Sequence, residues 1–272
     1  MIRRRPVLAP VLACAALLGV ASLAQGNAHA RQGTPPSTAT PLVAAASDLQ
    51  FALDEIVAGF RRHTGIAPRI TYGSSGNLAR QIEQGAPFEL FLSADEAYVA
   101  RLAARGLTQD DGTLYATGRI VLFTPHGSPL EPDPRLEDLA ARLASRTSGR
   151  LAIANPEHAP YGRAAEQALR SLGVWEALQP RLLLGENVAQ AAQFASSGNA
   201  DGGIIAHSLA LAPALRDRGR FVLLPETLHA PLRQRMVLLQ RASPAAARFY
   251  DYLRSPASRA ILGAHGFVLP EN

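Results

Sequence analysis

Four short segments of small, hydroxylic and amide residues each come directly before a predicted helix. They are Ala45–Asp48, Tyr72–Asn77, Asn155–Gly162 and Gly185–Val188. Each also follows a predicted strand, and in open α/β sheets ligands bind outside the carboxyl ends of the strands. The first N–H groups of a helix lack partners within the helix and carry partial positive charge, so a helix start suits an anion. If the fold brings these segments together, they predict an anion site.

Side chains in these segments can add to the backbone donors. Ser47 and Ser75 can each supply a hydroxyl donor, and Gly73 and Gly76 allow the backbone to approach a ligand closely. Ordinary helix capping explains any one of these residues equally well, because Ser, Asp and Asn are common N-cap residues. The spacing alone does not show that the four segments converge.

Strand-like and helix-like runs alternate along the chain. The first pair is the apolar run Leu42–Ala46 and the helical pattern Leu49–His63. The other expected strands are 69–72, 88–92, 120–124, 151–154, 182–184, 203–206 and 236–239. The other expected helices are 78–84, 96–104, 136–143, 163–172, 188–195, 244–254 and 256–263. This alternation predicts the α/β class, with largely parallel sheets covered by helices on both faces.

The N-terminal thirty residues have the composition of a cleaved secretory signal. Arg3–Arg5 are basic, Val7–Leu23 is almost wholly apolar, and Ala28–Ala30 offers small residues at a cleavage site. We therefore expect residues 1–30 to be a signal peptide and the polar residues 31–40 to be a flexible leader. Leu12–Cys14 resembles a lipoprotein cleavage box, and lipidation at Cys14 is the minority alternative.

Composition excludes several function classes for the exported chain. No segment after the signal has the length of apolar sequence that a membrane-spanning helix needs. Cys14 is the only cysteine, so disulfides, thiolate nucleophiles and cysteine metal sites are not expected. The chain has no lysine, and removal of the three arginines Arg3–Arg5 lowers the formal charge from +5 to +2. The arginines are scattered among acidic residues, so the sequence does not indicate a nucleic-acid surface.

Three other chemistries have weak sequence support. The order Gly-Ser-Ser-Gly at 73–76 does not match the Gly-x-Ser-x-Gly turn of a serine hydrolase. The histidines after the signal have no metal-ligand spacing: His63, His126, His158, His207, His229 and His265. An organic carboxylate would need an inward arginine, and the candidates Arg80 and Arg163 are expected to face solvent.

Several motifs resemble the molybdate-binding proteins of ABC importers. They are Ala44–Ser47, GSSGNLARQIEQGAPFELFLSADE at 73–96, NPEHAPYG at 155–162, GENVAQA at 185–191 and AHGFVLP at 264–270. The likeness runs from about Leu42 to Pro270, which is nearly the whole exported chain. GAPFELFLSADE together with NPEHAPYG is specific to this family rather than to solute-binding proteins in general.

The resemblance implies a two-lobed periplasmic-binding-protein fold that closes on an oxyanion. Each lobe would hold a mixed, mostly parallel five-stranded sheet, with lobe 1 at 41–120 and 228–272, lobe 2 at 121–227, and two crossover strands between them. The implied ligand is molybdate or tungstate, without a cofactor or catalytic residues. The implied protein is a periplasmic, monomeric non-enzyme that docks on a membrane permease. The motifs assign hydroxyl and backbone donors to Ser47 and Ser75, and backbone N–H donors to Tyr161 and Val188.

Two positions depart from parts of this family. One branch has a ligand-contacting tyrosine where this chain has Ala206, and another has asparagine where this chain has Asp48. We expect Asp48 to give its backbone N–H while its carboxylate turns away as a helix cap. Molybdate, tungstate and sulfate are fully deprotonated at neutral pH and need donors only, whereas phosphate keeps a proton and tolerates one acceptor. An inward Asp48 carboxylate would therefore favour phosphate.

Overall fold

The computed structural model describes residues 40–147 and 149–271. The predicted signal peptide, the leader up to residue 39 and the alternative lipidation site at Cys14 lie outside these residues. Within the described ranges, no helix is both long enough and apolar enough to span a bilayer.

The described chain contains ten strands in two five-stranded sheets. The strands are β1 (Leu42–Ala46), β2 (Arg69–Gly73), β3 (Leu90–Ser93), β4 (Thr113–Gly118), β5 (Ile120–Pro125), β6 (Leu151–Ala154), β7 (Leu182–Gly185), β8 (Gly202–Ala206), β9 (Gly219–Leu223) and β10 (Leu232–Leu238). The first sheet has the order β2-β1-β3-β10-β4, and the second has the order β7-β6-β8-β5-β9. We call each sheet with its helices a lobe.

Helices connect and cover these strands. The α-helices are α1 (Gln50–Thr64), α2 (Ser75–Glu83), α3 (Glu96–Ala104), α4 (Glu137–Ala144), α5 (Pro160–Ser171), α6 (Trp175–Leu178), α7 (Val188–Ser196), α8 (His207–Ala210), α9 (Pro213–Arg216), α10 (Pro244–Leu253) and α11 (Pro256–Ala264). The 3-10 turns are η1 (Ser47–Leu49), η2 (Gln179–Arg181) and η3 (Glu226–Leu228). The first lobe includes η1, α1–α3, α10 and α11, and the second includes α4–α9.

The two sheets have the same topology. In the first, β1 pairs in parallel with β2 and β3, while β10 pairs antiparallel with β3 and β4. In the second, β6 pairs in parallel with β7 and β8, while β5 pairs antiparallel with β8 and β9. Parallel and antiparallel pairings are thus equally common, a larger antiparallel share than the sequence predicts. The difference arises because β5 and β10, the strands that follow each crossing between the lobes, both enter a sheet in the reverse direction.

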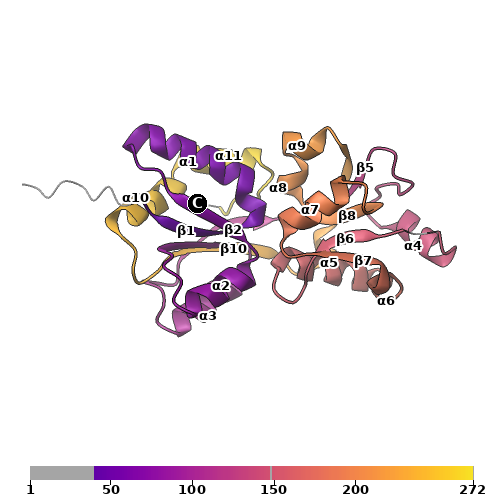
Figure 1. Cartoon of the computed structure of the whole chain (residues 1–272), viewed down its shortest axis with the longest axis horizontal. Helices are drawn as coiled ribbons and strands as arrows, with labels where there is room; N and C mark the ends of the chain where they lie inside the picture. Colours follow the sequence, from indigo (N-terminus) through magenta and orange to yellow (C-terminus); the bar gives the residue numbers. More distant parts are fainter. Residues whose placement is uncertain (1–39, 148, 272) are drawn as a thin grey trace, which may run out of the picture. The chain divides into compact units, whose positions relative to one another are not determined.

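Strand alternation divides the first lobe into two cores. On β1, Val43 and Ala45 pack in the core with Phe60 and Phe249, whereas Ala44 packs in the core with Leu78. Successive side chains of a strand point to opposite faces, so a fully buried strand serves both cores. Figure 1 shows α1 and α11 on one side of this sheet and α2 and α3 on the other.

The chain crosses between the sheets twice. It leaves the first sheet at the end of β4 and enters the second at β5, and it returns between β9 and β10. This arrangement confirms the two-lobed fold that the family motifs imply. The residue bounds predicted for the lobes stay a prediction, which the crossings at 118–120 and 223–232 make reasonable.

Candidate functional site

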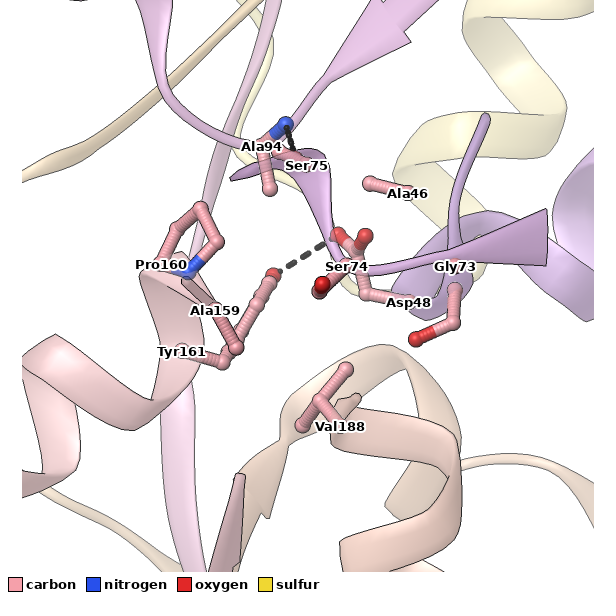
Figure 2. A pocket seen from close by; sticks show the side chains of 11 residues that line it. Ala46, Asp48, Gly73, Ser74, Ser75, Ala94, Ala159, Pro160, Tyr161 and Val188 are labelled. Atoms are coloured by element: carbon pink, nitrogen blue, oxygen red, sulfur yellow. Dashed lines mark hydrogen bonds between the residues drawn. The ribbon is translucent and has the colours of Figure 1, made fainter. Parts of the chain in front are cut away.

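One pocket gathers the carboxyl ends of five strands. It is lined by residues that end or follow β1, β2, β3, β6 and β7: Ala46, Ser47, Asp48, Gly73, Ser74, Ser75, Ala94, Ala159, Pro160, Tyr161 and Val188. The empty space inside it, including the part open to solvent, is about 180 Å³. All five residues predicted to bind the ligand, Ser47, Asp48, Ser75, Tyr161 and Val188, are among its lining residues. Figure 2 labels all of these except Ser47. The convergence that spacing could not show is therefore present.

Three of the four helix starts at this pocket have no side-chain cap. No side-chain hydrogen bond caps η1, α2 or α5, which begin at the pocket. The same holds for α1, α6, α8 and α9, whereas Asp95, Ser243 and Ser255 cap α3, α10 and α11. At the three pocket starts, Ser and Asp therefore do not have their usual capping role. Uncapped N–H groups remain available there for a ligand.

The fourth helix start is capped, but its first N–H group stays free. Asn187 accepts hydrogen bonds from Ala189 and Gln190 at 3.0 and 3.1 Å, which leaves the N–H of Val188. Among the described residues, no other residue accepts a hydrogen bond from the backbone N–H groups of Asp48, Ser75, Tyr161 or Val188. Asn187 therefore has the ordinary helix-capping role that the sequence left open as an alternative.

Two serine hydroxyls at the pocket accept hydrogen bonds from backbone N–H groups. Ser75 Oγ accepts from Ala94 N at 2.9 Å, and Ser47 Oγ accepts from Ala189 N at 3.3 Å. A hydroxyl that accepts in this way keeps its own hydrogen to donate elsewhere. Ser75 is fully buried and Ser47 is 3% exposed, so neither hydroxyl is hydrogen-bonded to bulk water. Each hydroxyl therefore keeps a hydrogen that it can donate to another acceptor.

The Asp48 carboxylate does not cap a helix, which corrects the expectation from the sequence. Its Oδ2 accepts from the Tyr161 hydroxyl at 2.9 Å (Figure 2) and from Gln234 Nε2 at 2.6 Å. Gln234 in turn accepts from the Tyr115 hydroxyl at 2.7 Å. Tyr161 belongs to the second lobe, whereas Asp48, Gln234 and Tyr115 belong to the first. The carboxylate therefore lies in a buried polar network between the lobes.

Burial governs the ionisation of this network. It raises the pKa of the Asp48 carboxyl to about 6, although the hydrogen bonds from Gln234 and Tyr161 act in the opposite direction. Burial and the charge of Asp48 raise the pKa of the Tyr161 hydroxyl well above its ordinary value. Tyr161 therefore stays protonated and donates. Its side chain serves Asp48, so only its backbone N–H is left for the pocket.

A second set of cross-lobe contacts lies where α2 meets the loop before α5. Gly76 N donates to the His158 carbonyl oxygen at 2.9 Å, and Ser74 Oγ lies 2.9 Å from His158 Nδ1. A Cβ on Gly76 would lie 2.5 Å from that carbonyl oxygen, so only glycine fits without a shift. Asn77 also donates to Glu186 across the lobes. These contacts hold the two lobes against each other beside the pocket.

Ser74, His158 and Glu186 have the order of a nucleophile, a base and a carboxylate. His158 Nε2 lies 3.7 Å from Glu186, whose side chain is 62% exposed. In a hydrolase triad the carboxylate orients the histidine through a buried hydrogen bond. Here the Glu186 carboxylate is in water and beyond hydrogen-bond distance, so the histidine serves the contact between lobes.

Arg163 also lies across the lobes, which corrects its expected solvent position. Its guanidinium bonds to Asp95 Oδ2 at 2.5 Å and to the Tyr98 hydroxyl at 2.7 Å. It does not line the pocket and is not a carboxylate clamp. Arg80 is exposed, as expected.

Gln234 and Tyr115 belong to the network around Asp48, and the sequence indicated neither. Gln234 stands between Arg233 and Arg235 on β10, a polar run that predicts an exposed segment, yet it is fully buried. Tyr115 lies on β4, a strand that the sequence did not predict. Ala206, the position of the missing tyrosine, ends β8 and does not line the pocket. Among the described residues, no group of three or more His, Cys, Asp or Glu side chains could hold a metal ion.

Comparisons with known proteins agree with this arrangement. A family model described as bacterial extracellular solute-binding protein matches residues 41–268. The chain is 35% identical over 238 residues to the molybdate-binding protein ModA of Rhodobacter capsulatus, covering 86% of this chain and 90% of the relative. It is 28% identical over 236 residues to a putative ABC transporter substrate-binding lipoprotein of Bacillus subtilis, covering 84% and 86%.

A solved structure gives the same result. The periplasmic molybdate-binding protein of Azotobacter vinelandii superposes with a TM-score of 0.75 at 30% identity, covering 85% of this chain and all of that one. Two lobes of the same topology, a pocket of helix starts between them and a family match over most of the described residues agree. The chain belongs to the bacterial extracellular solute-binding protein family.

Proposed function

We propose that this chain is the extracytoplasmic binding component of an ABC importer and captures molybdate or tungstate between its lobes. The observation that carries the proposal is the set of backbone N–H groups at Asp48, Ser75, Tyr161 and Val188, none of which donates to another residue and all of which lie at one pocket. A tetrahedral dianion without protons can only accept hydrogen bonds, and these groups can only donate. The Ser47 and Ser75 hydroxyls complete the set of donors.

The names of the relatives favour molybdate over other oxyanions. The relatives from Rhodobacter and Azotobacter are described as molybdate-binding proteins at 35% and 34% identity. Tungstate has the same charge and nearly the same size, so the same donors serve it. Phosphate is the second candidate, because the buried Asp48 carboxylate at the pocket could accept the proton that phosphate keeps.

The remaining parts of the proposal follow the family. We propose a periplasmic protein released by cleavage after residue 30, acting as a monomer and docking on a membrane permease. The Bacillus relative is described as a lipoprotein, which keeps lipidation at Cys14 as the alternative form of export. We propose no enzymatic activity.

Calorimetric titration of the exported chain with molybdate, tungstate, sulfate and phosphate tests the proposal. We expect tight binding of molybdate and tungstate and much weaker binding of the other two. Phosphate binding more tightly than molybdate would replace the ligand but leave the transport role. Turnover of an ester substrate that Ser75→Ala abolishes would instead reveal a hydrolase.

A further inference from the structure

The Asp48 carboxyl is the acidic group at a pocket otherwise made of donors. Its residue is 1% exposed. Oδ2 accepts two hydrogen bonds, from Tyr161 and Gln234, whereas Oδ1 is buried without a hydrogen-bond partner. The backbone N–H groups of Asp48 and Leu49 also lower the pKa of this carboxyl, but burial outweighs them. A buried, unpartnered carboxylate oxygen is costly and is an atom on which a proton can be accommodated.

Neutral groups surround this carboxyl. The titratable groups that contact it, or contact its partner Gln234, are Tyr161 from α5 and Tyr115 from β4. Ser208 on α8 donates to the backbone oxygen of Asp48 at 2.7 Å, and α2 and α7 contribute Ser74, Ser75 and Val188 to the pocket. None of the ion pairs among the described residues includes Asp48.

Two histidines lie on elements packed against this region. His158, before α5, contacts Ser74 through Nδ1, and His207, at the start of α8, lies 3.3 Å from the Gly266 carbonyl oxygen. Neither is hydrogen-bonded to the Asp48 carboxyl. Burial lowers the pKa of His207, so its charge does not offset that of Asp48 at neutral pH. Any proton linkage from His158 has to be separated by experiment.

A bound dianion would change the ionisation of Asp48 further. Burial in the closed lobes already raises the pKa of this carboxyl to about 6. An adjacent dianion disfavours a second negative charge and raises the pKa again. In an open, hydrated cleft the burial that raises the pKa of this carboxyl would be relieved, and the pKa would lie nearer its ordinary value. Closure on the ligand therefore shifts Asp48 from the ionised toward the protonated form.

We propose that Asp48 takes up one proton from solvent on Oδ1 when the lobes close on a tetrahedral dianion, so that capture of the anion is coupled to protonation. This rests on the proposed function. The proton removes the one charge that would repel the dianion and turns Oδ1–H into a further donor. Asp48 thus becomes a specificity-determining residue, which favours fully deprotonated anions when neutral and a protonated anion such as phosphate when ionised.

The sign of the pH dependence follows from linkage. Because the bound state holds more protons than the free state, binding is tightest at the acidic end of the range and weakens as the pH rises. With uptake of a full proton, the Kd rises about tenfold per pH unit until the pH exceeds the pKa of Asp48 in the complex. Above that pKa the dependence disappears.

Asp48→Asn is the decisive variant. Asparagine keeps a carbonyl oxygen to accept from Tyr161 and Gln234 and presents N–H donors in place of the protonated oxygen. Calorimetry with molybdate between about pH 6 and 8, in buffers of different ionisation enthalpy, counts the protons taken up. We expect up to one proton for the wild-type protein and none for Asp48→Asn, whose Kd changes less than about twofold over that range.

Control variants distinguish this proposal from other sources of proton uptake. His158→Gln should still take up the proton on binding. If His158→Gln takes up no proton while Asp48→Asn still does, the proton belongs to the histidine and the proposal is overturned. Wild-type binding with no proton uptake and no pH dependence would also overturn it, while the proposed function would stand. If neither wild type nor Asp48→Asn binds any oxyanion, the proposed function itself fails.

Discussion

The two lobes repeat one topology but present different chemistry to the pocket. The turn after β1 corresponds to the turn after β6, and the turn after β2 corresponds to the turn after β7. In the first lobe these turns carry Ser47, Asp48 and Ser75, whose side chains reach the pocket region. In the second lobe they carry Tyr161 and Val188, of which only the backbone N–H is available.

This difference teaches which lobe can be changed by ordinary substitution. Side chains in the first lobe can gain or lose hydroxyl and carboxyl groups, so selectivity for the anion resides there. The second lobe offers donors that every residue except proline has. Substitutions in the second lobe therefore change the pocket donors less. The largest effects on binding should come from changes that prevent the second lobe from approaching the first.

Gly76→Ala should have the largest effect, because it separates the lobes. The new Cβ would lie 2.5 Å from the His158 carbonyl oxygen and 2.7 Å from the Tyr98 hydroxyl. We expect molybdate affinity to fall by more than about 100-fold, since the donors of the second lobe no longer reach the ligand. Calorimetry measures the loss, and small-angle scattering should show that ligand no longer compacts the protein. Gly263→Ala, where a Cβ meets only Leu269 at 3.6 Å, is the control and should bind normally.

Val188→Pro tests the backbone donor of the second lobe directly. Val188 is the first residue of α7, where proline fits a helix and removes only an N–H that has no partner in the helix. We expect about 10- to 100-fold weaker binding from loss of a hydrogen bond to a charged ligand. Val188→Ala keeps the N–H and should bind within about threefold of the wild type. Equal losses in both variants would mean that the side chain, not the N–H, matters.

Ser75→Ala tests the hydroxyl donors of the first lobe. The change removes a donor to the anion and leaves the N–H of Ala94 without its acceptor. We expect roughly tenfold weaker molybdate binding, with a small loss of thermal stability. Ser75→Thr retains a hydroxyl and should recover part of the affinity. Unchanged binding by Ser75→Ala would place the ligand away from α2.

Tyr161→Phe should have the smallest effect on affinity and a distinct effect on pH dependence. The variant keeps the backbone N–H but removes the hydroxyl that donates to Asp48 Oδ2. Because that hydrogen bond lowers the pKa of Asp48, its loss raises the pKa. Molybdate binding becomes independent of pH once the pH exceeds the pKa of Asp48 in the complex. We expect this limit to move to a higher pH in the variant. A downward move would show that Tyr161 does not stabilise the ionised carboxylate.

Much of the fold was predictable from apolar periodicity. The helix at 96–104 has the predicted bounds, and β1, β2 and β5–β8 lie within a few residues of prediction. The strands β4 and β9 were missed. Both lie at the edge of a sheet and combine polar with apolar residues, so neither shows the apolar run of a buried strand.

The helix starts at the pocket were predictable from the sequence, but the hydrogen-bond network around Asp48 was not. Helix-start composition and family motifs indicated Ser47, Ser75, Tyr161 and Val188, and all line the pocket. The partners of Asp48 were not predictable, because Gln234 is 186 residues away and sits in an arginine-rich run. Only the antiparallel pairing of β10 with β3 and β4 brings that side chain into the interior.

The hydrogen bond from Asn77 to Glu186 gives a means of trapping the ligand. These residues meet from opposite lobes beside the pocket, and residues 31–272 contain no cysteine. A double variant with Asn77→Cys and Glu186→Cys would carry a single pair of thiols, which a short bifunctional reagent could join without side reactions. The joined protein would hold its anion through dilution and dialysis, so a reversible carrier would become a container that opens only when the linker is cleaved.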